Sequence, residues 1–174
     1  MPIPAYMTIS LVEEEELCEG ACTTESIGIM AEEIVDEEMQ NTIQVVGFEG
    51  LIHVPTNPNS GVPTGTRIHK GMKFTKVWDK TSPLLFQALC DGQQITNLEL
   101  QFYRITDGEA ENYYTITLND AIITKIESYM PNCLDWRNEA LTQLEDVWIN
   151  YKAITVSHEV AGVEGADEWG GEEE

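Results

Sequence analysis

The chain has 174 residues, a length that suits one domain able to bury its own core. Acidic side chains outnumber basic ones by 31 to 9, and the resulting formal net charge of −22 opposes binding to nucleic acid or to an anionic membrane surface. No stretch approaches the ~20 apolar residues of a membrane span, and the N-terminus lacks the pattern of a cleaved signal. We therefore expect a protein that folds in the cytoplasm and, if it is exported, leaves without a cleaved signal.

Strand signals open the chain. Residues 6–11, 42–48 and 51–54 are rich in β-branched and aromatic side chains. Because Glu49 and Gly50 separate the last two segments, we expect them to be two strands joined by a turn.

Alternation of apolar and polar side chains continues in the second half. It runs over residues 98–103 and 114–119, with Asp107-Gly108-Glu109 between them as a hairpin loop. Residues 147–151 alternate again, with Val147, Ile149 and Tyr151 on one face. The sequence thus predicts a mainly β protein of at least six strands.

One helix is expected to interrupt the strands. Ser82 is a good N-cap, Pro83 suits the first helical position, and Asp91-Gly92 ends the run. The apolar residues between them share one face, which would flank or plug a barrel.

A loop at residues 55–66 is too rich in Pro, Gly and Asn for regular structure, and it is long for a connection within a compact domain. Such a loop is either mobile or a contact arm. Next to it, five of the nine basic residues fall between positions 67 and 80: Arg67, Lys70, Lys73, Lys76 and Lys80. We expect Lys70, Lys73, Lys76 and Lys80 to face acidic surface of a neighbouring subunit, or to protect an exposed strand edge from mispairing.

The remaining charge is mostly acidic. Runs at residues 13–16, 36–38 and 172–174 are expected to be solvated, and residues 164–174 are expected to form an acidic C-terminal tail. Cys18, Cys22, Cys90 and Cys133 show no paired metal-binding spacing and are expected to be free thiols.

Signatures of catalysis are not found in the chain. His53, His69 and His158 are far apart in sequence, and a lone histidine beside a strand is more often a hydrogen-bonded structural residue than a base or ligand. We therefore expect no catalytic residue, no metal site and no cofactor.

Several segments, read in order, resemble the Hcp (haemolysin co-regulated protein) family, which forms the inner tube of the type VI secretion system. The similarity is carried by Ile3-Pro4-Ala5-Tyr6, Val54-Pro55-Thr56-Asn57-Pro58, Arg67-Ile68-His69-Lys70, Phe74-Thr75-Lys76, Asp79-Lys80-Thr81-Ser82-Pro83-Leu84-Leu85, residues 98–104, residues 114–121 and Asp167-Glu168-Trp169. Each piece alone is a weak signal, but their common order is specific. The chain departs from the family where Val12-Glu13-Glu14-Glu15-Glu16 replaces a Gly-rich stretch, and in its scarcity of basic residues.

The resemblance implies a β-barrel of two packed antiparallel sheets with one short α-helix, as also found in phage tail tubes. It implies homohexameric rings that stack into a hollow tube, with sheath, baseplate and spike components as partners and small effector proteins as cargo of the lumen. By this resemblance, ring or stacking contacts fall on the loop residues Thr56, Asn57, Pro58, Asn59, Ser60 and Gly61. Glu49 is the position expected to face the lumen, and the acidic composition favours cargo with a basic exterior.

Two other readings remain at this point: a secreted binding module of sandwich type, and an enzyme. A binding module would be monomeric with a concave ligand patch, whereas an enzyme would gather titratable groups in a pocket. A tube subunit would instead run as a large ring in solution.

Overall fold

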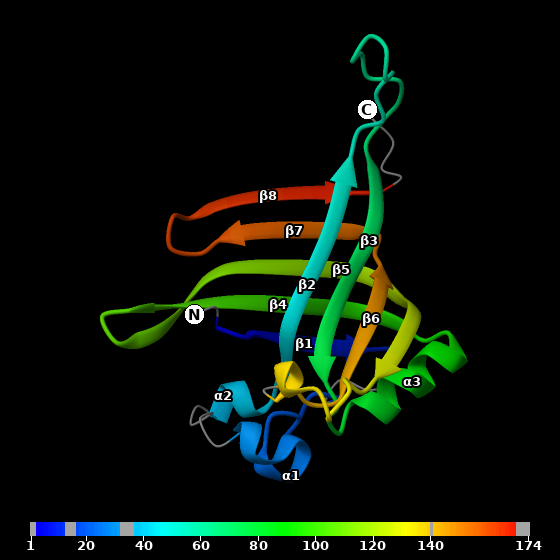
Figure 1. The fold of residues 1–174 in the computed structure, drawn as a ribbon. Coiled ribbons are helices and arrows are strands. Elements are labelled where there is room, and N and C mark those ends of the chain that lie inside the picture. Colours follow the sequence, from blue (N-terminus) through cyan, green and yellow to red (C-terminus); the bar gives the residue numbers. More distant parts are fainter. Residues whose placement is uncertain (1–2, 13–16, 32–36, 140, 170–174) are drawn as a thin grey trace.

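Six antiparallel strands close on themselves in the computed structural model, which describes residues 3–12, 17–31, 37–139 and 141–169. The strand order is β4-β1-β2-β3-β6-β5-β7-β8, and a further pairing of β4 with β5 closes the ring of β1 to β6 (Figure 1). The strands are β1 Ala5–Leu11, β2 Ile43–His53, β3 Ile68–Val77, β4 Gln94–Thr106, β5 Glu109–Tyr129, β6 Leu144–Asn150, β7 Ala153–His158 and β8 Val163–Glu168. The expected fold class, a barrel-like antiparallel β fold, is confirmed.

Strand β5 is long enough to serve two sheets. Its residues 115–119 pair with β7, whereas residues 122–129 pair with β6. Asp120, at φ 50°, marks the change between them. β2, β3, β6 and the second half of β5 therefore form one sheet, which runs roughly across the strands β1, β4 and β7 (Figure 1).

The core lies inside the closed ring. Its largest fully buried apolar side chains come from five strands, from helix α3 (Ser82–Asp91) and, for Leu17, from the segment between β1 and α1: Phe74, Met7, Ile9, Leu11, Leu17, Ile43, Leu85, Ile95, Leu98, Leu100 and Leu118. The expected alternation is confirmed in β6, where Val147 and Ile149 are buried and Trp148 between them is only partly covered. Removing this much apolar surface from water is the main favourable term in folding.

The hairpin between β4 and β5 turns at Asp107 and Gly108, as the sequence predicts, whereas Glu109, also expected in the loop, is the first residue of β5 and pairs with Thr106. Asp107 and Gly108 both have positive φ, at 54° and 90°. Two such residues in succession match the tight turn that follows the right-handed twist of paired strands.

Helix α3 begins one residue earlier than its sequence suggests. Thr81 occupies the N-cap position, and Gly92 ends the helix in the left-handed conformation. The predicted N-cap Ser82 is wrong by one position because its hydroxyl accepts hydrogen bonds from Asp79 N and Lys76 Nζ instead.

Three further expectations are corrected. The two strands expected at residues 42–48 and 51–54 are one strand, β2, because β2 continues past Gly50 by shifting register against β3. Residues 164–168 are not a tail but belong to β8, because they pair with β7 along its length. Between β1 and β2 lie short helical turns that the sequence did not predict: α1 Thr24–Ile27, η1 Gly28–Ala31 and α2 Glu37–Gln40.

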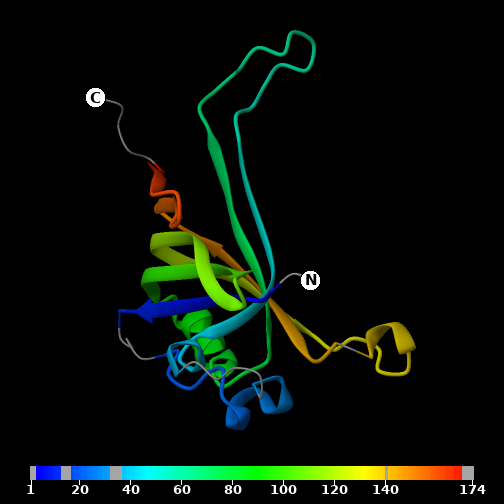
Figure 2. The same cartoon turned by 90° about the vertical axis from the view of Figure 1, so that its left-hand side faces the viewer.

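Two segments project from this body at opposite ends of the β2-β3-β6-β5 sheet (Figure 2). The first is the arm, defined as residues 50–66: the outer end of β2 and the loop to β3. The second is the lobe, defined as residues 130–143 without position 140, which connects β5 to β6 and contains the 3₁₀ turn η2 Trp136–Asn138. Acidic residues 13–16, 36 and 172–174 lie outside the described residues, whereas Glu37 and Glu38 are exposed.

Candidate interaction surfaces

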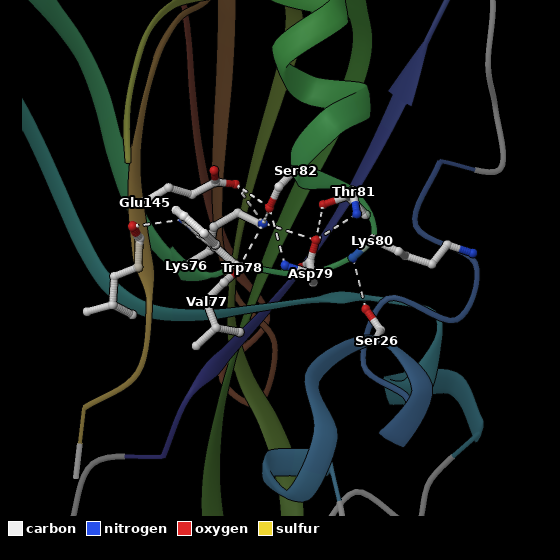
Figure 3. Close-up of polar contacts among 10 residues, drawn as sticks. Ser26, Lys76, Val77, Trp78, Asp79, Lys80, Thr81, Ser82 and Glu145 are labelled. Atoms are coloured by element: carbon white, nitrogen blue, oxygen red, sulfur yellow. Dashed lines mark hydrogen bonds and ion pairs between the residues drawn. The ribbon is translucent and has the colours of Figure 1, made fainter. Parts of the chain in front are cut away.

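A buried ionic cluster surrounds Lys76 beneath the first turn of α3 (Figure 3). Lys76 is 0% exposed, and its Nζ lies 2.8 Å from Glu145 Oε1 and 3.0 Å from Asp79 Oδ1. The same amine donates to Val77 O and to Ser82 Oγ. Because its ammonium is fully enclosed by its own subunit, Lys76 cannot contact a neighbour as the sequence predicted.

The two carboxylates of this cluster also order the start of α3. Asp79 Oδ1 accepts hydrogen bonds from the backbone N and the hydroxyl of Thr81, and Glu145 Oε1 accepts one from Ser82 Oγ. Glu145 belongs to β6. The cluster therefore ties β3, β6 and α3 together, and it explains why a lysine stands in the core.

A second ionic group lies on the opposite, outer face of the same sheet. The strand pairing aligns Glu49, Lys73, Trp148 and Lys125 in one row across β2, β3, β6 and β5. Lys73 Nζ lies 2.9 Å from Glu49 Oε1 and 3.8 Å from Asp146 Oδ2, and the hydrogen bond that Lys73 donates to Glu49 raises the pKa of Lys73. Lys125 and Lys73 both approach the ring of Trp148, at 4.1 and 5.8 Å from its centroid. We call Glu49, Lys73, Trp148 and Lys125 the outer row.

The outer row borders a shallow hollow of about 270 Å³, to which Lys70 and Gly71 also contribute. Lys70 is exposed there. Lys80 is exposed at the other end, beside Glu19 and Glu25. The structure thus divides the basic cluster of the sequence: Lys70 and Lys73 reach the surface at the same hollow, Lys80 reaches it elsewhere, and Lys76 does not reach it.

Arg67 and His69, just beyond the arm, hold the C-terminal strand. Asp167 of β8 pairs with the Arg67 guanidinium and lies 2.8 Å from His69 Nε2, while His69 Nδ1 lies 2.9 Å from the hydroxyl of Tyr151. Trp169 stacks on the imidazole, with 6.0 Å between ring centroids. The Arg67 hydrogen bond lowers the pKa of Asp167 to about 2. We call this group the C-terminal latch, and it accounts for His69 as a hydrogen-bonded structural residue.

The arm is an ordered projection. Backbone hydrogen bonds join Asn57 N to Val62 O, Gly61 N to Asn57 O and Thr64 N to Pro55 O, each at 2.8 Å. Thr56 and Pro63 form an isolated bridge. All six predicted contact residues, Thr56, Asn57, Pro58, Asn59, Ser60 and Gly61, are exposed along it.

The lobe and Trp148 are surfaces that sequence reasoning missed. Leu134 is 91% exposed and Trp136 79% exposed, which is unusual for side chains of this size. A cluster of large apolar residues outside any alternating segment was the available signal. Met130, Leu134, Trp136 and Leu141 fall within twelve positions.

Nucleophilic and ligand-type side chains do not converge in the described part of the chain. No group of three His, Cys, Asp or Glu side chains there could hold a metal ion. Cys18 and Cys22 are buried free thiols, and burial raises the pKa of each to about 11. Cys90 and Cys133 are exposed free thiols. Over the same residues, no helix has the length and apolarity needed to cross a membrane.

The fold defines a class: mainly β proteins built on a closed antiparallel sheet with a projecting hairpin. Residues 26–158 match the family described as "Type VI secretion system effector, Hcp". The chain belongs to this Hcp family.

Individual relatives agree with the assignment. The chain is 44% identical over 170 residues to the "Major exported protein" of Pseudomonas aeruginosa, covering 97% of this chain and 96% of that protein. A solved structure described as "Crystal structure of Hcp protein" superposes with a TM-score of 0.89 at 34% identity, covering 95% of this chain and 97% of the other. The secreted protein Hcp3 from Pseudomonas aeruginosa superposes at 0.76 with 37% identity, covering 95% and 99%.

Proposed function

We propose that this chain is the subunit of a type VI secretion inner tube, in which homohexameric rings stack and the assembled tube is exported. Membership of the Hcp family supports the proposal. The observation that carries it within this chain is the arm. An ordered projection that contributes nothing to its own subunit's core has little use in a monomer, whereas it suits a contact between subunits.

The outer row supplies the wall of the lumen in this proposal. Its sheet is broad and uncovered within the subunit, as a surface repeated around a channel would be. Glu49, whose side chain is 74% exposed, stands at one end of the row and is the proposed lumen contact. Lys70, Lys73 and Lys80 remain proposed contacts between subunits, and sheath, baseplate and spike components remain proposed partners.

Mass in solution tests the proposal. Light scattering behind a sizing column should give about 117 kDa, six times the 19.5 kDa chain. A clean 19.5 kDa monomer at micromolar concentration and moderate salt would contradict it and favour a separate binding module.

Cargo carriage has a test of its own. Small effector proteins with a basic exterior should be recovered less well by Glu49→Lys than by the unaltered protein, because the substitution places three cations in the outer row. Glu164→Lys, on the exposed strand β8, is the matched charge change away from the row. Equal recovery by both variants would contradict the proposal that Glu49 contacts cargo in the lumen.

A further inference from the structure

We propose that the arm of one subunit docks on the lobe of a subunit in the neighbouring ring. The proposal deepens the tube function and rests on it. It assigns the lobe, residues 130–139 and 141–143, as the receiving surface for residues 50–66 of a second copy of this chain.

Charge is the first reason. The longest stretch of the chain without Asp, Glu, Lys or Arg is residues 50–66, which is the arm itself. A ring of six copies carries a formal charge of 6 × −22 = −132, so two rings that approach each other repel. The described lobe has only Asp135, Arg137 and Glu139 as charged side chains, a net −1. Arm and lobe are therefore surfaces that such rings can bring together at little electrostatic cost.

Exposed apolar side chains are the second reason. In the arm, the exposed fraction is 51% for Leu51, 45% for Val54 and 58% for Val62. In the lobe, Leu134 and Trp136 are joined by Met130 and Leu141, whose exposed fractions are 62% and 52%. Several large apolar side chains exposed on one short segment indicate an interaction site, and a large aromatic side chain such as Trp136 is the type that anchors interfaces.

Both surfaces are ordered before they meet. In the lobe, Asn132 Oδ1 accepts from Leu134 N, Asp135 Oδ1 accepts from Arg137 N, and Asn138 Nδ2 donates to Asn132 O. The lobe thus satisfies its polar groups internally while its apolar side chains face outward. Together with the hydrogen-bonded arm tip, this arrangement reduces the entropy lost on association.

Geometry is the third reason. Val77, at the end of β3 farthest from the arm, pairs with Leu144, and Leu144 follows the lobe directly. Arm and lobe are therefore separated by the length of the sheet, roughly 30 Å for the ten residues of β3 (Figure 2). A contact between two different patches at opposite ends of a subunit is head-to-tail. When successive copies are related by translation along an axis, such a contact repeats from one copy to the next and builds an open stack.

Cysteine cross-linking tests the contact in assembled protein. Cys133 already lies in the lobe, so the background variant is Cys90→Ser, which removes the other exposed thiol. Asn59→Cys, Ser60→Cys and Val62→Cys each place one thiol on the arm. Because a disulfide needs Cα atoms within about 7 Å, mild oxidation of tubes should link at least one of these positions to Cys133 and give a ladder of linked chains. Thr106→Cys, beside the exposed β4–β5 turn, is the control and should give no link to Cys133.

The outcomes separate the two proposals. Tubes without any arm–Cys133 link in peptide mass spectrometry would overturn the arm–lobe contact and leave the tube function standing. Links that form equally in isolated rings would overturn its placement between rings. Absence of both rings and tubes would remove the tube function and this inference with it.

A second variant pair measures the same contact without new thiols. Leu134→Ser with Trp136→Ser should keep the mass of the ring and reduce the number of tubes at least tenfold. Phe86→Ser on α3 removes a side chain that is 59% exposed and should leave tube number unchanged. Undiminished tubes from the lobe variant would overturn the proposal.

Discussion

Lys73 and Lys76 are three residues apart on β3, yet they belong to different parts of the molecule. Lys76 is enclosed with Asp79 and Glu145, whereas Lys73 lies in the outer row beside the exposed Glu49. Side chains alternate along a strand, so positions separated by an odd number face opposite ways. Identical charges close in sequence can therefore have unrelated roles: one holds the fold together and the other shapes a surface.

The largest effect should come from Lys76→Ala. It leaves two buried carboxylates without their cation, and breaking a buried pair in this way costs about 3–5 kcal/mol of unfolding free energy. Urea unfolding followed by circular dichroism measures it. Lys80→Ala, an exposed lysine nearby, should change stability by about 0.5 kcal/mol or less. A loss below about 1 kcal/mol for Lys76→Ala would show that the cluster is not a structural element.

Gly71, which precedes both lysines on β3, should have the next largest effect. Its φ is +78°, and an added Cβ would meet the side chain of Asn150 and lie 2.8 Å from Ile149 O. Gly71→Ala should therefore cost about 2–3 kcal/mol, since backbone strain and a clash with β6 add. Gly61→Ala in the arm is the matched control, because φ is +68° there and nothing lies within 4 Å. Equal losses of unfolding free energy for the two variants would mean that the close approach of β3 and β6 at Gly71 adds nothing to the cost of the substitution.

The C-terminal latch should show a smaller effect that depends on pH. The pKa of Asp167 is lowered to about 2 from its ordinary 3.8, so its stabilising contribution is complete above pH 4 and fades as pH falls towards 2. Asp167→Asn should be less stable than the unaltered chain at pH 7, and the difference should shrink between pH 4 and 2 in thermal unfolding. Glu164→Gln, on the same strand, is the matched control and should lower stability less than Asp167→Asn at pH 7. A difference in stability that is independent of pH would contradict the claim that the ionised Asp167 carboxylate stabilises the fold through the C-terminal latch.

Lys73→Ala should have the smallest effect on the free energy of unfolding, because surface ion pairs are weak and screened by salt. A double-mutant cycle with Glu49→Ala gives the coupling between the two, which should fall when sodium chloride is raised from about 0.1 to 1 M. Coupling above about 2 kcal/mol would mean that the outer row stabilises the subunit as strongly as the buried cluster.

Much of the fold was predictable because its signals are local. Alternation in residues 98–103, 114–119 and 147–151 identified strands, and the Asp107-Gly108 pair identified the turn. Gly50 misled the prediction, since a glycine inside a long strand looks like a turn until its partner strand is known.

The interaction surfaces were less predictable, because their partners are distant in sequence. Glu145, which keeps Lys76 in the core, is 69 positions away, and Asp167, which pairs with Arg67, is 100 positions away. The alternation rule alone separates Lys73 from Lys76, but it does not say which of them is buried. The arm was recognisable from its Pro and Gly content, whereas its proposed receiving surface required the position of the lobe at the far end of the sheet.

Electron microscopy of the purified protein across a sodium chloride series is the most direct test of the tube assignment. We predict hollow six-fold rings at low salt and stacked tubes as salt rises towards about 1 M, where the Debye length of about 3 Å leaves only direct contacts between the acidic rings. Tubes that are abundant at low salt and disperse as salt rises would contradict the stacking account. Particles without a lumen at every salt concentration would contradict the tube itself.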